Sequence, residues 1–381
     1  MRREVFGDEH DLFREQVRRF VREEVEPLVP KWNEVGMSDR ETWRRAGQEG
    51  FLGVNAPEEY GGAGADFLYS AIVIEELAYA RAHGLHVPLH SDICLPYIAH
   101  YGSDAQKEKY LPGAISGEII LGICMTEPGT GSDLAAVQTS ARLDGDHYVI
   151  NGSKTFISNG QIGDLYIVVA KTDSQAQPPH KGISLILVEA NTPGFQRGRK
   201  LDKLGLRGQD TSELFFKDCR VPASNLLGQE GQGFRMLMEA LQQERLVVGV
   251  GSMASCRRAL DDTIAYVKER KAFGKRIADF QNTQFKLAEL ATEVEIGQVF
   301  VDRLVAAHVA GDDIVTEVSG AKWWTTDLQK KLTAECLQLH GGYGFMREYP
   351  IAEDYADAAV QSIYAGTNEI MKVIISRRLG L

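Results

Sequence analysis

The sequence has few basic clusters, and its charge is predominantly acidic. Its 381 residues include 42 Lys and Arg against 53 Asp and Glu, which gives a formal net charge of −11. Because neutralising nucleic-acid phosphates requires clustered Lys and Arg, we expect no nucleic-acid partner. The one compact basic run, at 197–200, is interrupted by Gly198, and we interpret it as a solvated loop. Contact with a ligand phosphate is the alternative.

Cysteines are also few, and long apolar runs are missing. The five cysteines are scattered without a CxxC pair, which is typical of free thiols in a reducing compartment. No apolar run approaches the length of a membrane helix. Glu4, Asp8, Glu9 and Asp11 lie where an export signal would need an apolar stretch. We therefore expect a cytoplasmic protein without membrane insertion.

Several common catalytic and ligand-binding motifs are missing or lie in the wrong context. No GxSxG turn is present. Residues 249–254 fit the GxGxxA pattern, but they lie inside a helical run with no strand before them, so we do not expect a dinucleotide site there. His83, His86 and His90 have metal-like spacing, yet Pro88 interrupts them and no carboxylate completes a set. We expect no metal, with a histidine site as the alternative.

The hydrophobic pattern divides the chain into helical, β-rich and helical regions. Helical spacing dominates the first third and returns in segments near 233–271, 282–310, 315–340 and 353–379, which indicates an antiparallel bundle at the end of the chain. Between them, two Asn-Gly pairs follow short apolar runs and are typical of hairpin turns. We predict an α+β fold with domains at 1–118, 119–228 and 229–381.

A glycine-rich turn opens the β-rich region. Residues 126–133, with the sequence TEPGTGSD, combine one proline and two glycines with the hydroxyls of Thr126 and Ser132. Backbone N–H groups in such a turn can approach a flat or anionic ligand closely. A plain surface turn is the alternative.

One carboxylate is placed unusually on the helix that begins near Gly233. Leu237, Leu241 and Val248 form an apolar stripe, and Glu244 and Arg245 fall on or beside it. A glutamate is rarely buried unless it is paired, and burial would raise its pKa and make it a better-matched base near neutral pH. The alternative is an edge position paired with a nearby cation.

The last motif lies between two helical runs. Gly366 breaks the first run, and Thr367 can cap the next. A helix N-terminus presents free N–H groups that suit a carbonyl or an anion. A simple kink between two helices is the alternative.

Five segments in order resemble the acyl-CoA dehydrogenase family, from the first helix to the last residues. They are CMTEPGTGSD at 124–133, NGSKTFISNG at 151–160, RKAFGKRIADFQ at 270–281, QLHGGYGFMREYP at 338–350 and IYAGTNEI at 363–370. The resemblance implies an N-terminal helical domain, a middle β-barrel domain and a C-terminal four-helix bundle. It also implies FAD as the cofactor, bound between the barrel and the bundle.

The resemblance assigns residues to the FAD site. Those implied to meet the flavin are Met125, Thr126, Gly131, Ser132, Phe156, Ile157, Ser158, Thr367 and Glu369. Those implied to hold the adenosine and pyrophosphate of a neighbouring subunit's FAD, or to form the other half of that site, are Arg270, Phe273, Gln281, Gln338, Gly341 and Gly342. A cofactor shared in this way implies a homodimer or a homotetramer built as a dimer of dimers, of which we expect the tetramer.

The position of the catalytic base departs from the commonest family pattern. Many members carry a glutamate directly before the Gly-Thr of the last motif, where this chain has Ala365. A minority carry the base earlier, in a Glu-Arg-Leu sequence, and here that residue is Glu244. Ser132, Arg245, Ala365 and Gly366 are implied to contact the substrate, with the Ala365 N–H and an FAD hydroxyl holding the thioester carbonyl.

The implied reaction is the α,β-dehydrogenation of a fatty-acyl-CoA to a trans-2-enoyl-CoA in β-oxidation, with an electron-transferring flavoprotein as acceptor. The segments 89–102 and 363–372 are most similar to long-chain acyl-CoA dehydrogenases. Alternatives are a branched-chain (isovaleryl-type) enzyme, a dehydrogenase of carrier-protein thioesters and an acyl-CoA oxidase. Retention of Glu244 with the flavin-contacting set disfavours a non-catalytic binding protein.

Overall fold

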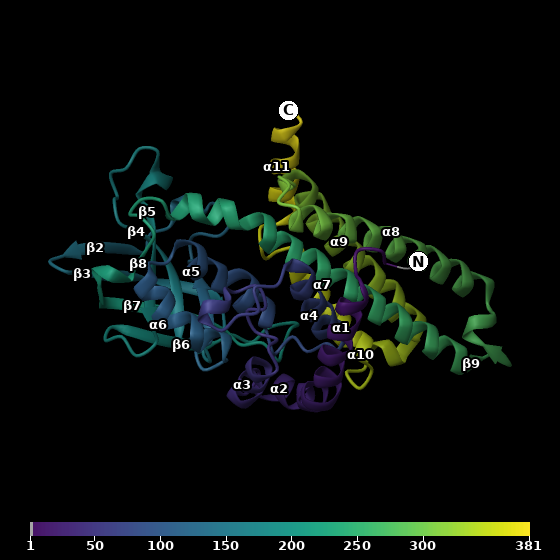
Figure 1. Ribbon diagram of the computed structural model, residues 1–381. Helices are drawn as coiled ribbons and strands as arrows, with labels where there is room; N and C mark the ends of the chain where they lie inside the picture. The colour runs from purple at the N-terminus through teal and green to yellow at the C-terminus, as the bar shows by residue number, and fades with distance from the viewer. Residues whose placement is uncertain (1–2) are drawn as a thin grey trace.

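A computed structural model describes residues 3–381 and shows a β-rich body on one side of the molecule and a helical body on the other (Figure 1). The predicted α+β architecture of helical, β and helical regions is confirmed. The boundaries predicted at 118/119 and 228/229 fall in connecting segments and stay predictions, and the first two residues of the first predicted domain lie outside the described chain. No helix within 3–381 is both long and apolar enough to span a membrane.

The N-terminal region is a set of helices around a central buried one. Its helices are α1 (Asp8–Phe20), α2 (Val29–Val35), α3 (Arg40–Gln48), α4 (Phe67–Tyr79), the π-helical segment η4 (Pro88–Cys94), α5 (Leu95–Tyr101) and α6 (Asp104–Ile115). Asp66 caps α4 by accepting a hydrogen bond from the Leu68 N–H at 2.8 Å. Because α4 packs against α1, α7 and α8, its side chains from Phe67 to Ala78 are almost all buried.

The middle region is one eight-stranded sheet that curves around its own core. Its strands are β1 (Leu121–Cys124), β2 (Ser140–Asp144), β3 (His147–Ser158), β4 (Leu165–Lys171), β5 (Ile183–Glu189), β6 (Phe195–Lys200), β7 (Thr211–Pro222) and β8 (Leu226–Leu227). The order is β6-β7-β3-β2-β4-β5-β8, with β1 on β4. In β4, Tyr166 and Val168 face the interior of the sheet, whereas Leu165 and Ile167 pack against helices. Burial on both faces explains why β4 and β5 are continuously apolar.

The basic run at 197–200 forms most of β6, so the loop interpretation is wrong. Arg197 donates to the Gly163 carbonyl at 2.6 Å, and Lys200 donates to the Val35 carbonyl. These two cations therefore form hydrogen bonds that tie β6 to the segments around Gly163 and Val35. The strand pairs with β7 at an edge of the sheet. Phe195 is its one buried residue, so its apolar content is too low for a strand signal.

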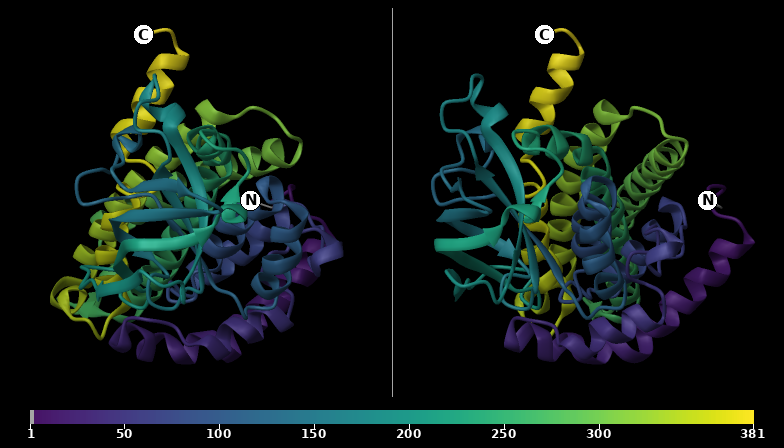
Figure 2. Two further views of the ribbon diagram at one scale, coloured as in Figure 1. Left: turned by 90° about the vertical axis from the view of Figure 1, so that its left-hand side faces the viewer. Right: turned by 60° about the vertical axis from the view of Figure 1, so that its left-hand side comes forward.

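The C-terminal region is a bundle of long helices: α7 (Gly233–Glu269), α8 (Gln281–Val309), α9 (Val315–His340), α10 (Pro350–Gln361) and α11 (Asn368–Arg378). The two-residue strands β9 (Lys271–Ala272) and β10 (Lys275–Arg276) join α7 to α8. Helix α7 has 37 residues and is therefore about 55 Å long. It contacts α4, α8 and α9 and also β5, so one helix connects all three regions. Both views in Figure 2 show α11 extending away from the rest of the molecule.

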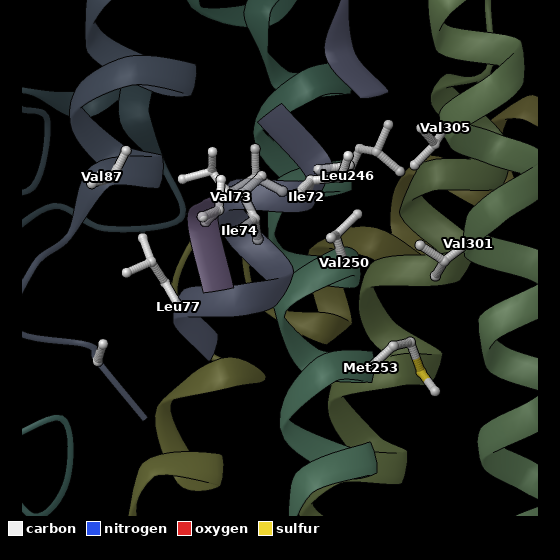
Figure 3. Packing of buried hydrophobic residues seen from close by; sticks show 14 of the residues in the cluster. Ile72, Val73, Ile74, Leu77, Val87, Leu246, Val250, Met253, Val301 and Val305 are labelled. Atoms are coloured by element: carbon white, nitrogen blue, oxygen red, sulfur yellow. The ribbon is translucent and has the colours of Figure 1, made fainter. Parts of the chain in front are cut away.

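The largest hydrophobic core joins the first and last regions. Figure 3 shows Ile72 of α4, Leu246 and Val250 of α7, and Val301 of α8 gathered between their helices. Each of these four side chains is at most 1% exposed. This core fixes α4 against α7 and so sets the spacing of the two helices that flank the cavity described next.

Candidate active site

A cavity lies where α4, η4, the β1 and β3 strand ends, α7 and the segment after α10 converge. Its volume is about 230 Å³. Its lining is mainly apolar and includes Ile74, Leu77, Leu89, Ile93, Met125, Thr126, Phe156, Ile157, Ser158, Glu244, Val247, Val248, Gly251, Ser255, Tyr364 and Ala365. We refer to this space as the Glu244 cavity.

Glu244 is the buried carboxylate of this cavity. It lies on α7 and is 4% exposed, and Oε1 accepts a 2.9 Å hydrogen bond from the Tyr97 hydroxyl on α5. Burial raises the pKa of Glu244 to about 7, while the Tyr97 hydrogen bond and the Arg245 charge act in the opposite direction. A carboxylate with this pKa is matched to accept a proton near neutral pH.

The segment between α10 and α11 forms the opposite wall. Ala365 and Gly366 both have left-handed φ angles, of 51° and 84°, so the chain turns sharply where Ala365 lines the cavity. The buried ammonium of Lys322, on α9, donates to the Gly366 carbonyl at 2.7 Å and to Asn368 Oδ1 at 3.1 Å. As predicted, Thr367 caps the next helix and accepts from the Ile370 N–H at 3.4 Å.

A buried ion pair holds the sheet side of the cavity. Lys154 Nζ donates to Glu127 at 2.9 Å and to the Met125 carbonyl at 3.1 Å, and Glu127 also accepts from the Gln138 and Thr139 N–H groups. The Thr126 carbonyl accepts from the Thr155 N–H of β3 at 3.0 Å. The first residues of the TEPGTGSD turn are therefore fixed by the strand that carries the second motif.

Phe156 is an exposed aromatic side chain in this wall. A shift in strand register between Lys154 and Ile157 leaves Phe156 with a left-handed φ of 59°, and its side chain is 66% exposed while Ile157 is 2% exposed. A bulge of this kind re-aims one side chain out of the strand pattern. An exposed aromatic ring beside the Thr126 and Ser158 hydroxyls fits a flat ring with polar edges, such as the flavin of FAD.

The structure brings together seven of the predicted site residues. Glu244, Met125, Thr126, Phe156, Ile157, Ser158 and Ala365 all line the Glu244 cavity. The other predicted contacts lie around it: Gly131 and Ser132 are in an exposed turn, and Thr367 and Glu369 flank the start of α11. The cofactor and substrate contacts of all these residues stay predictions.

Arg245 lies away from the cavity lining. Its Nη1 donates to Ser319 Oγ on α9 at 3.4 Å, and its Nε is buried without a partner among the described residues. Burial lowers the pKa of the guanidinium, and the neighbouring Glu244 charge raises it. The predicted substrate contact of Arg245 therefore has no support from its position.

A second cavity gathers four residues predicted for the neighbouring subunit's FAD. Arg270, Gln338, Gly341 and Gly342 line it together with Lys286 and Tyr343. The Arg270 guanidinium lies 5.0 Å from the centroid of the Tyr343 ring. A cation beside an aromatic ring suits an anionic ligand with a flat group, while Lys286 is paired with Glu335. Phe273, 95% exposed, and Gln281 lie outside this cavity.

The three histidines with metal-like spacing have separate partners. His83 Nε2 lies 3.6 Å from Asp357 Oδ2, and His86 contacts the Gln209 amide. His90 lies between the Ala114 carbonyl, 2.9 Å from Nε2, and the Leu121 N–H, 3.1 Å from Nδ1. The geometry thus places the proton of neutral His90 on Nε2. Within residues 3–381, no group of three His, Cys, Asp or Glu is arranged to hold a metal ion.

Sequence reasoning missed Tyr97 and Lys322. Tyr97 is 147 positions from Glu244, and helical spacing does not reveal a contact between two separate helices. Lys322 left a stronger signal, because it lies on a face of α9 that also carries the buried Ser319, Thr325 and Thr326. A lysine on a buried face needs a partner, although the sequence does not say which one.

Comparisons with known proteins agree with this geometry. Family models for the N-terminal, middle and C-terminal domains of acyl-CoA dehydrogenases match residues 7–118, 122–219 and 231–380. The chain is 49% identical to the mitochondrial long-chain specific acyl-CoA dehydrogenase of Mus musculus, over 99% of this chain and 88% of the relative. It is 38% identical to the mitochondrial isovaleryl-CoA dehydrogenase of Pongo abelii, over 97% and 88%.

A solved structure leads to the same assignment. The crystal structure of acyl-CoA dehydrogenase from Geobacillus kaustophilus superposes with a TM-score of 0.98, at 53% identity and with 100% of both chains covered. Together with a buried carboxylate, an exposed aromatic ring and three matched domains, this likeness settles the family. The chain belongs to the acyl-CoA dehydrogenase family and is an FAD-dependent oxidoreductase.

Proposed function

We propose that the protein converts long-chain fatty-acyl-CoA to trans-2-enoyl-CoA, with Glu244 as the catalytic base. The observation that carries the proposal is the buried Glu244 carboxylate, with a pKa of about 7, in a mainly apolar cavity. Ala365, at the commoner position of the base, lines the same cavity and cannot accept a proton. In this chain the carboxylate on α7 therefore takes the role that a carboxylate at position 365 has in the commoner family pattern.

Different residues of the cavity have different roles in the proposed reaction. Glu244 takes the proton from the substrate α carbon, which is only weakly acidic, so the negative charge that develops on the thioester oxygen must be stabilised. We assign that task to the Ala365 N–H, on the turn fixed by Lys322. Met125, Thr126, Phe156, Ile157 and Ser158 hold the flavin. FAD, when bound, would accept the β hydrogen as a hydride.

The acyl tail follows α7 away from Glu244. From Glu244 the cavity lining continues past Val247 and Val248 to Gly251 and Ser255, three turns or about 16 Å of helix. The opposite side is formed by apolar residues of α4, including Ile74 and Leu77. Length along α7, together with higher identity to the long-chain relative than to the isovaleryl relative, supports a long linear substrate.

A shorter or branched acyl-CoA is the second candidate substrate. The cavity volume of about 230 Å³ is below the roughly 300–1,000 Å³ typical of small-molecule pockets. A long tail must therefore displace side chains between α4 and α7, whereas an isovaleryl group would not. The small cavity volume is the observation that favours this alternative.

Anaerobic titration of the flavin absorbance tests both substrate classes. The FAD-loaded protein would be titrated with linear acyl-CoAs from C4 to C18 and with isovaleryl-CoA, beside Glu244→Gln. We expect bleaching by wild type, strongest with long chains, and none by Glu244→Gln. Strongest bleaching by isovaleryl-CoA would select the second candidate. Undiminished bleaching by Glu244→Gln would refute the base, and no bleaching by any acyl-CoA would point to carrier-protein thioesters.

We further propose an electron-transferring flavoprotein as the acceptor and a homotetramer as the assembly. Each turnover leaves two electrons on the protein, which must pass to a partner before the next substrate reacts. The second cavity, with Arg270 and Gln338, provides the surface on which a neighbouring subunit would complete a cofactor site. Rapid reoxidation by oxygen instead would identify an acyl-CoA oxidase, and light scattering of the holoenzyme would give the subunit number.

A further inference from the structure

The base of this site has a hydrogen-bond donor from another helix. Tyr97 lies on α5, is 1% exposed, and its hydroxyl lies 2.9 Å from Glu244 Oε1. Among residues 3–381, it supplies the side-chain hydrogen bond that Glu244 accepts. A tyrosine ring is rigid and closely packed here, so the hydroxyl has little freedom to leave the carboxylate.

The other ionisable groups near Glu244 form no hydrogen bond with its carboxylate in the described chain. Arg245, the next residue on α7, directs Nη1 to Ser319. Burial and the Glu244 charge both raise the pKa of the Cys94 thiol on η4 well above its ordinary value, so this thiol stays neutral. Tyr97 itself also stays protonated, because burial and the Glu244 charge raise its pKa. Tyr97 is therefore a permanent donor to this carboxylate.

The remaining ionisable side chains that line the cavity make their printed contacts with residues other than Glu244. Burial lowers the pKa of His86 to about 3, which leaves it neutral above pH 5. Burial raises the pKa of Tyr364, which also stays neutral. His83 lies 3.6 Å from Asp357 and does not contact Tyr97 in any hydrogen bond of the described chain.

We propose that Tyr97 is a positioning residue for the reaction: its hydroxyl fixes Oε1 of Glu244 and leaves Oε2 to take the α proton. The inference rests on the proposed role of Glu244 as the base. A donor stabilises the carboxylate relative to the carboxylic acid and so opposes the effect of burial. Tyr97 therefore also keeps part of the base ionised at the pH at which the enzyme works.

The chain contains a matched control for this contact. One turn further along α5, the Tyr101 hydroxyl donates to Glu239 Oε2 on the same helix α7, at 2.8 Å. This second pair is exposed and does not line the Glu244 cavity. Tyr101→Phe thus removes a hydrogen bond between the same two helices without touching the base.

The experiment compares holoenzymes of wild type, Tyr97→Phe, Tyr101→Phe and Glu244→Gln. kcat and KM would be measured from pH 5 to pH 9 with an artificial electron acceptor and the best linear acyl-CoA. For Tyr97→Phe we expect kcat at pH 7 to fall about tenfold with KM within about twofold, because a hydrogen bond to a charged group is lost. The acid limb of its profile should move to higher pH by about one unit. Tyr101→Phe should match wild type.

Each failure has its own signature. If Glu244→Gln stays active, the proposed base is wrong and the inference falls with it. If Glu244→Gln is inactive but Tyr97→Phe keeps the wild-type acid limb, or matches Tyr101→Phe, Tyr97 only packs the helices and the inference is overturned. Should Tyr97→Phe not fold, 3-fluorotyrosine at position 97, a stronger donor of nearly the same size, should move the acid limb to lower pH. An unmoved limb would overturn the proposal equally.

Discussion

The ammonium group of Lys322 donates a 2.7 Å hydrogen bond to the carbonyl oxygen of Gly366. This bond ties the first third of α9 to the turn that carries Ala365, whose N–H we assign to the thioester oxygen. Lys322 is fully buried, and burial lowers its pKa to about 8. A buried lysine with only neutral acceptors in hydrogen-bond contact is costly, so its position is explained best by what it holds in place.

Lys322→Met should lower kcat more than it changes KM. The variant leaves the Gly366 carbonyl without its donor, which costs about 1–3 kcal/mol, and it frees the turn at Ala365. We expect a kcat loss of about tenfold to a hundredfold by steady-state kinetics. Lys330→Met is the matched control, because Lys330 contacts Ser362 from the same helix but is exposed. Equal effects of the two variants would contradict the assignment.

The raised pKa of Glu244 should make the protein less stable as pH increases. Its ordinary pKa of 4.5 rises to about 7 on burial, so the folded state binds the proton more tightly than the unfolded state. The free energy of unfolding therefore falls between pH 4.5 and pH 7, by about 3 kcal/mol in total. Glu244→Gln removes this penalty.

Thermal unfolding at several pH values checks this prediction. Glu244→Gln should match wild type near pH 5 and melt several degrees higher at pH 8. Glu239→Gln is the control, because Arg235 lowers the pKa of this exposed carboxylate and its charge is not penalised. The prediction fails if the melting difference between Glu244→Gln and wild type is the same at pH 5 and pH 8.

The sequence predicted the elements of the fold better than their contacts. The periodicity that predicted helices near 233–271 and 315–340 is local, and α7 and α9 have nearly these limits. The same periodicity marked Glu244 as a carboxylate on a packed face, and the structure confirms that it is buried. It could not identify Tyr97, because that contact joins helices whose relative placement depends on the whole core. Local patterns also could not predict the exposure of the Phe156 side chain, because its orientation comes from a bulge in the pairing of β3 with β7.

Gly251→Leu should shorten the preferred acyl chain. A Cβ at position 251 would meet only Ile74 Cγ2, at 3.7 Å, and both residues line the tail end of the Glu244 cavity. A larger side chain would fill this end. We expect kcat/KM for a C16 substrate to fall at least about tenfold relative to C4, because each excluded methylene is worth about 1–3 kcal/mol.

The control for Gly251 lies half a turn away on the same helix. A Cβ at Gly249 would point toward Val301, Ala321 and Thr325 in the bundle instead of the cavity. Gly249→Ala and Gly251→Ala gain similar helix propensity, so a change in chain-length preference confined to the variants at 251 would come from the cavity. If variants at 249 and at 251 change the chain-length preference in the same way, the acyl tail does not lie beside Gly251.

Lys154→Met should destabilise the sheet side of the site. Lys154 is 0% and Glu127 6% exposed, and burial lowers the pKa of Lys154 while Glu127 opposes the change. Removing the lysine leaves a buried carboxylate without its cation, which typically costs about 3–5 kcal/mol. The Met125 carbonyl also loses its donor, so the turn that we assign to the flavin would loosen.

The double variant Lys154→Met with Glu127→Gln separates charge from position. If the uncompensated charge causes the loss, the neutral pair should recover part of the melting temperature. The amide oxygen introduced by Glu127→Gln can accept from only one of the Gln138 and Thr139 N–H groups, which Glu127 holds with separate oxygens. FAD affinity, measured by fluorescence quenching of the free cofactor, should stay weakened in the double variant, because nothing replaces the bond to the Met125 carbonyl. Full recovery of both quantities would mean that Lys154 only neutralises Glu127 and does not shape the turn.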